Sequence, residues 1–287
     1  MEIFRGEYFL LRLKAGNYRL APFHCELVPL EHTPSLLLYP SHCAAVGASG
    51  SNKTTSANRI DETTEAIWKE LRRLVSTVRR MMAQSADGQR DRGEEHRVVL
   101  MESAAHAGPQ DMHVHSVIDL VPVPASLLDE VVMSFQSAFN DASSDWAQHR
   151  AKIALTKQKP LYTAIPRHFP YYWVEWAEDD GVVHPIDQAE AGIDGRSGKN
   201  GTVDDDLDTN MPGRGHSFAG DGNGKSSRGG SSSNGFFCFD VLAVALEEDE
   251  ARWRRTRPPE SQAQTSRAVQ SFKERWTRVV EWTQAVH

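Results

Sequence analysis

Two short segments of the sequence carry histidines at spacings that suit phosphate chemistry. The first, PFHCELVPLEH, places His24 and His32 at the two ends of an expected strand and its exit turn. The second, DMHVHSVIDLVPVP, places His113 and His115 at alternate positions, so that both face the same side of a strand. Alternating imidazoles can hold a phosphate, and a neutral imidazole can attack phosphorus to give a nucleotidyl-histidine intermediate. Histidines at strand ends can equally be surface or packing residues, and spacing alone does not separate these interpretations.

The segments around these histidines predict an α+β fold. Residues 65–82 place eight apolar side chains at helical spacing, which is typical of an amphipathic helix, whereas 98–102 (VVLME) is typical of a buried strand. Strands are expected at 8–13, 25–30, 98–102, 115–121, 171–176 and 181–186, and helices at 65–82, 127–139, 236–248 and 266–282. This order indicates an α+β protein rather than a parallel α/β protein.

Composition excludes several classes of protein. The 287 residues carry a formal net charge of −7, so any contact with nucleic acid has to come from a local basic surface. The three cysteines, Cys25, Cys43 and Cys238, form no CxxC pair, which predicts no disulfide framework and no metal site. No apolar run approaches the ~20 residues that span a bilayer, so we expect a soluble intracellular protein. Two polar segments, 47–58 and about 188–234, are expected to be disordered, the second as an insertion inside a domain.

Taken in order, these segments resemble the C-terminal half of the CwfJ family. The run from His24 to His32 is similar to the histidine-triad (HIT) segment H-x-L-I-x-P-x-x-H. Residues 98–102 and 115–124 are similar to the closing strands of the first CwfJ C-terminal domain. Four further segments are similar to the second: 165–172, 181–186, 237–243 and 272–282. The resemblance implies a HIT-like antiparallel sheet with helices over residues 1–126, followed by a smaller α+β subdomain over 127–287 that ends in helices.

The resemblance also implies a function. CwfJ proteins are associated with the intron-lariat spliceosome and with lariat debranching. It therefore implies a nuclear protein whose partners are spliceosomal proteins, the lariat-debranching enzyme and intron-lariat RNA, with no membrane and no cofactor.

The triad positions of this sequence depart from those of active HIT enzymes. An alignment without gaps puts His115, Val117 and Asp119 at the three positions, and valine cannot act as the central nucleophile. The chain would then be a pseudoenzyme in which His24, His32 and His115 line a remnant phosphate- or RNA-binding pocket, with no catalytic residue.

Two other functions stay open at this point. A register shifted by two residues makes His115 the nucleophile, with His113 beside it, and gives an active HIT-type nucleotide hydrolase or transferase. A third possibility is a structural adaptor that uses Tyr171, Tyr172, Trp173 and Trp176 as a protein interface, although core packing is the expected role of these aromatics.

Overall fold

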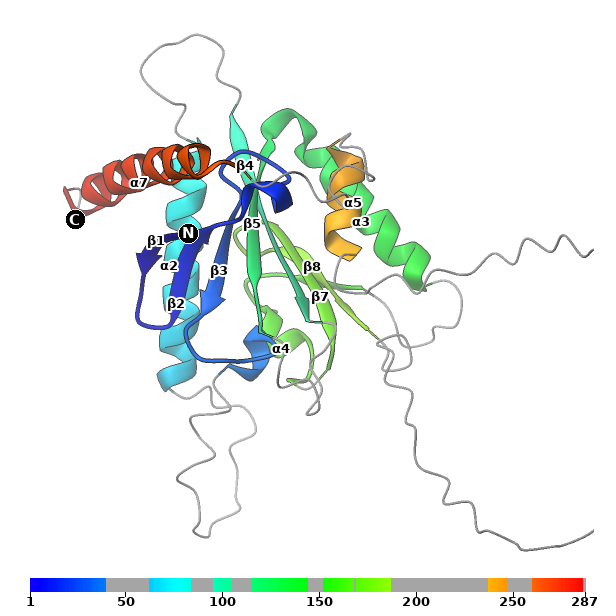
Figure 1. Cartoon of the computed structure of the whole chain (residues 1–287). Helices are drawn as coiled ribbons and strands as arrows, with labels where there is room; N and C mark the ends of the chain where they lie inside the picture. Colours follow the sequence, from blue (N-terminus) through cyan, green and yellow to red (C-terminus); the bar gives the residue numbers. More distant parts are fainter. Residues whose placement is uncertain are drawn as a thin grey trace, which may run out of the picture.

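A single antiparallel sheet forms the centre of the protein (Figure 1). The computed structural model describes residues 1–39, 62–83, 95–104, 115–143, 152–167, 169–186, 237–246 and 260–285. Within these residues eight strands pair in the order β1-β2-β3-β5-β4-β7-β8-β6. Their bounds are β1 Glu2–Arg5, β2 Phe9–Leu13, β3 Cys25–Pro29, β4 His96–Ala104, β5 Ile118–Pro124, β6 Ile153–Leu155, β7 Tyr171–Ala177 and β8 Asp180–Pro185.

Helices cover both faces of this sheet. The long helices α2 (Glu62–Ala83) and α7 (Gln262–Ala285) lie on one face, and α3 (Leu128–Ser143) and α5 (Phe237–Ala245) lie on the other (Figure 1). The short elements are α4 (Leu161–Ala164) and the 3-10 turns η1 (Gly16–Tyr18), η2 (Leu36–Leu38) and η3 (Ala125–Leu127). No helix in these described ranges is long and apolar enough to cross a bilayer.

Alternation along the strands divides the apolar side chains between two cores. In β5, Ile118 and Leu120 pack with α2 and α7, whereas Val121 and Val123 pack with α3 and α5. Successive side chains of a strand point to opposite faces, so a strand that is covered on both sides is apolar at nearly every position. Asp119, the second residue of β5, breaks this pattern, and its side chain is buried.

The sheet joins the two predicted regions, 1–126 and 127–287. Strands β1 to β5 come from the first region and β6 to β8 from the second, and the two sets meet where β4 pairs with β7, from Leu100↔Glu175 to Ala104↔Tyr171. The division into 1–126 and 127–287 stays a prediction, but backbone hydrogen bonds and both cores run across it.

The predicted α+β class is confirmed, and each predicted strand and helix has a counterpart in the structure. Strands β1 and β6 were not predicted, because four and three residues are too short to establish an alternating pattern.

β5 begins at Ile118 rather than at His115 and continues through Pro122 and Pro124. Prolines are tolerated there because β3 pairs with β5 only as far as Leu120, which leaves that end of β5 bonded on one side. The segments 47–58 and 188–234 lie outside the described residues.

Two arginines of α2 form ion pairs with a strand of the sheet. Arg72 and Arg79 both contact the buried carboxylate of Glu175 in β7, Arg79 at 3.2 Å. These ion pairs fix α2 against the strand that begins the second half of the sheet.

Gly181 of β8 is a position where only glycine fits. It pairs with Glu175, and a Cβ at this position would lie 2.4 Å from the Val174 carbonyl oxygen and 2.8 Å from the Glu175 Cα. Because both atoms belong to backbone, Gly181→Ala is expected to lower the free energy of unfolding by about 1–3 kcal/mol in urea denaturation. Gly16→Ala is the control, since the three atoms nearest to its Cβ belong to the Glu260 side chain, which can move. Equal losses in the two variants would contradict this account.

Candidate functional site

The structure brings together two of the three histidines expected to share a pocket. His24 directly precedes the five-residue strand β3, and His32 lies three residues after that strand ends. At about 3.3 Å per residue the two histidines are therefore at opposite ends of β3. His115 lies with His32, whereas His24 belongs to a different cluster. His113 lies outside the described residues.

His32 and His115 form an imidazole pair. Their ring centroids are 4.9 Å apart and the rings meet edge to face, with 68° between their planes. His32 is exposed and His115 is half-buried, so the pair is open to solvent. A backbone hydrogen bond ties the two segments together, because the Ser116 N–H donates to the Thr33 carbonyl at 2.6 Å. The Nδ1 of His115 lies 3.1 Å from the Ser116 carbonyl, which leaves its Nε2 for another partner.

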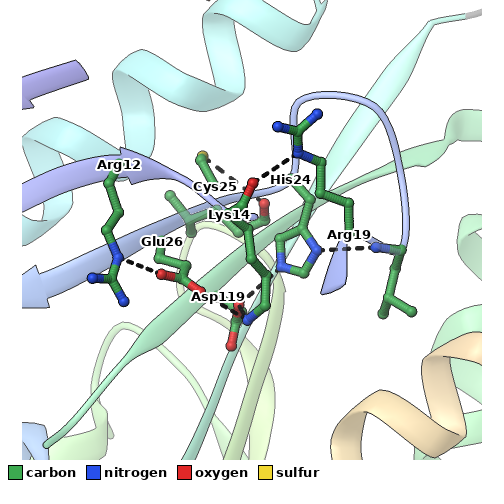
Figure 2. A network of polar contacts seen from close by, with 9 residues as sticks. Arg12, Lys14, Arg19, His24, Cys25, Glu26 and Asp119 are labelled. Carbon is green, nitrogen blue, oxygen red and sulfur yellow. Dashed lines mark hydrogen bonds and ion pairs between the residues drawn. The ribbon is translucent and has the colours of Figure 1, made fainter. Parts of the chain in front are cut away.

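His24 has no solvent-exposed surface and uses both ring nitrogens (Figure 2). The Leu20 N–H donates to Nδ1 at 3.2 Å, and Nε2 lies 2.9 Å from Oδ1 of Asp119. Since Nδ1 accepts, Nε2 carries the proton and donates it to the carboxylate. Burial lowers the pKa of His24, which keeps the ring neutral despite the neighbouring carboxylate.

Lys14 connects the pair of His24 and Asp119 to a second carboxylate (Figure 2). Its Nζ binds Oδ1 of Asp119 and lies 2.9 Å from Oε1 of Glu26, whose other oxygen lies 2.6 Å from Nε of Arg12. Burial alone would lower the pKa of Lys14, but the charges of Asp119 and Glu26 raise it. Burial alone would likewise raise the pKa of Asp119, but the charge of Lys14 and the hydrogen bond from His24 hold it below its ordinary value. The network is therefore an ionised lysine and two ionised carboxylates around a neutral histidine.

A helix from the second half of the chain covers this network. The ring of Phe239 in α5 lies over Lys14, 4.6 Å from its Nζ, and 5.9 Å from the His24 ring. With its nitrogens occupied and no exposed surface, His24 is closed to a ligand in this arrangement.

No motif or spacing in the sequence selects Lys14 or Glu26. Their positions are the features that could have identified them: Glu26 interrupts a buried strand, and Lys14 directly follows another. Such residues are candidates for a buried ion pair, but their pairing depends on the register of β2, β3 and β5, which the sequence does not specify.

Three of the four aromatics considered as an interface are core residues. Tyr171 and Trp173 are fully buried on the α2 and α7 side, and Tyr172 is buried on the opposite side. Trp176 is partly buried. This confirms core packing as the role of the first three.

A cavity of about 380 Å³ lies near His96, at the opposite end of β4 from the imidazole pair. Arg79 and Arg97 line it, but each already pairs with a carboxylate, Glu175 and Glu95 respectively. It therefore offers no uncommitted arginine to an anion. Within the ranges that the structure describes, no three His, Cys, Asp or Glu side chains are grouped so as to hold a metal ion.

Comparison with known proteins identifies relatives of the chain. Residues 145–283 match the family described as "Protein similar to CwfJ C-terminus 2". The CWF19-like protein 2 of Danio rerio is 26% identical over 175 residues, which are 61% of this chain and 14% of the relative. The CWF19-like protein 2 homolog of Drosophila melanogaster is 30% identical over 76 residues, which are 26% of this chain and 11% of the relative. The chain thus matches only a small part of the length of these relatives.

Proposed function

Because residues 145–283 place this chain in the CwfJ family, we propose that it is a nuclear splicing-related factor that binds intron-lariat RNA and partner proteins without chemical turnover. The family match and the CWF19-like relatives support the role in splicing. The RNA contact is assigned to the open imidazole pair of His32 and His115, and His24 becomes a structural residue.

The observation that carries this proposal is the contact between Asp119 and His24. In the alignment without gaps, Asp119 holds the third triad position, and its ionised carboxylate faces the His24 ring at 2.9 Å. A negative charge at that position repels a phosphate, and the valine at position 117 supplies no nucleophile. A phosphate can instead be met by the side chains of His32 and His115, which reach solvent. Nδ1 of His115 donates to the Ser116 carbonyl, so Nε2 of this ring donates to a phosphate only in the imidazolium form.

RNA binding through this pair is expected to depend on both rings. Hydrogen bonds to a charged group contribute about 1.5–3 kcal/mol, so His115→Ala is expected to weaken binding about tenfold or more. Fluorescence anisotropy with a labelled single-stranded RNA measures the Kd at a fixed salt concentration. His96→Ala, at the other end of β4, is the matched control. An unchanged Kd in both His32→Ala and His115→Ala would reject this surface as the RNA site.

The preference for lariat RNA is tested with the same variants. A branched RNA with a 2′,5′ linkage is compared with a linear RNA of the same sequence, with and without purified lariat-debranching enzyme. Tighter binding of the branched RNA and a ternary complex with the enzyme are the expected results. Equal affinity for the two RNAs and no complex would leave only a general RNA-binding role.

The active HIT-type enzyme is the competing function. Its signature is hydrolysis of adenosine phosphoramidate that disappears in His115→Ala. We expect background activity in the wild type and in His115→Ala. A nucleophile has to lie within about 3–3.5 Å of the reacting atom, and the valine at position 117 supplies none.

A further inference from the structure

A buried carboxylate lies beneath the imidazole pair. Glu102, near the end of β4, is 1% exposed, and both of its oxygens accept hydrogen bonds. Oε1 accepts from the Leu36 N–H at 2.8 Å and from the Ser116 hydroxyl at 2.6 Å. Oε2 accepts from the Tyr171 hydroxyl at 2.6 Å. Among the described residues none of its hydrogen-bond donors is a cation, so these three donors alone compensate its burial.

Two of these donors belong to the segments that carry the histidines. Ser116 directly follows His115, and Leu36 lies four residues after His32. The same two segments meet through the bond from the Ser116 N–H to the Thr33 carbonyl. Beyond the pairing of β3 with β5, the carboxylate and this backbone hydrogen bond therefore join the two segments close to the imidazoles.

The third donor comes from the other half of the chain. Tyr171 is the first residue of β7, is fully buried, and belongs to the range 145–283 that matches the CwfJ family. Its partner across the sheet is Ala104, two residues after Glu102. A residue of the second region thus completes the support of a site whose histidines belong to the first.

We propose that Glu102 and Tyr171 are positioning residues that hold His32 and His115 at their mutual spacing, so that this site is complete only when both halves of the sheet are present. The identity of the ligand rests on the proposed function, whereas the positioning does not. Burial raises the pKa of Glu102, whereas hydrogen bonds from Ser116, Tyr171 and Leu36 oppose the rise. These three donors therefore favour the ionised form of the carboxylate.

Tyr171→Phe in the full chain tests the proposal, with Tyr172→Phe as the matched control. The two tyrosines are neighbours on β7, both are buried and they face opposite cores, so both variants remove one tyrosine hydroxyl from the same strand. The first readout is the position of the His32 and His115 imidazole signals in NMR spectra, assigned with single His→Gln variants. Tyr171→Phe is expected to shift both signals and Tyr172→Phe to leave them in place. The second readout is the Kd for single-stranded RNA, which Tyr171→Phe is expected to raise about threefold or more, because residues in one hydrogen-bond network are coupled.

The outcomes separate the two claims. Imidazole signals that move no further in Tyr171→Phe than in Tyr172→Phe would overturn the positioning role. Shifted signals in a protein that does not bind RNA would support positioning and reject the proposed function instead. If Tyr171→Phe does not fold, Ser116→Ala removes a different donor from the same carboxylate, and the same comparison of imidazole signals decides.

Discussion

Replacing Lys14 with alanine is expected to lower the free energy of unfolding by about 3–5 kcal/mol, because it leaves buried carboxylates without their shared cation. The side chains of Glu26 and Asp119 are each 8% exposed, and that of Lys14 is 13% exposed, so water replaces the lost charge poorly. Glu26 keeps Arg12, whereas Asp119 keeps only the neutral ring of His24 among the partners described here. The uncompensated charge of Asp119 is therefore the main source of the loss.

Arg12→Ala is the matched control for Lys14→Ala. Arg12 also pairs with Glu26, but its side chain is 40% exposed. Exposed ion pairs contribute about 0–1 kcal/mol, so this variant is expected to be nearly as stable as the wild type. Urea denaturation of the two variants beside the wild type measures both losses. Similar, small losses would mean that Asp119 becomes protonated or hydrated at little cost.

The second large effect is a loss of stability as the pH falls below the ordinary pKa of histidine. Burial lowers the pKa of His24 in the folded protein, whereas in the unfolded chain it titrates near about 6.5. Below that pH the unfolded chain binds a proton that folded His24 does not bind. The free energy of unfolding is therefore not reduced by His24 above about pH 6.5. It declines as the pH falls from there toward the folded pKa of His24, by up to ~1.4 kcal/mol per pH unit.

His24→Asn isolates this contribution. The variant is expected to be less stable than the wild type at neutral pH, with a difference that shrinks as the pH falls from about 7 to 5.5. Urea denaturation at several pH values measures it. A difference that stays constant over this range would show that folded and unfolded His24 bind protons alike. Asp119 acts in a separate window, because its lowered pKa gives stability that is lost only as the pH falls below about 4, the ordinary value for aspartate.

Local patterns predicted most of the fold. The apolar spacing of α2 and the buried strands β4 and β7 follow directly from periodicity, and the α+β class follows from their order. The single sheet was not predicted, because pairing of β4 with β7 joins residues about 70 positions apart and no local pattern encodes it.

The candidate site was predicted less completely for the same reason. His32 and His115 were selected from spacing and resemblance, and they do lie together. His24 was expected beside them, but eight residues that include an extended strand place it far from His32. Lys14, Glu26, Glu102 and Tyr171 matter through partners on other strands, so their roles become visible only once the register is known.

The pairing of β4 with β7 also bears on how the protein is synthesised. Strand β4 leaves the ribosome about 70 residues before β7, and β5 can cover only one of its edges. Until β7 arrives, the backbone of Leu100 and Met101 presents an open, apolar strand edge, which is the kind of surface that pairs with other chains. A product that ends before residue 171 therefore keeps this edge open, and a chaperone that binds it would protect the chain against aggregation during translation.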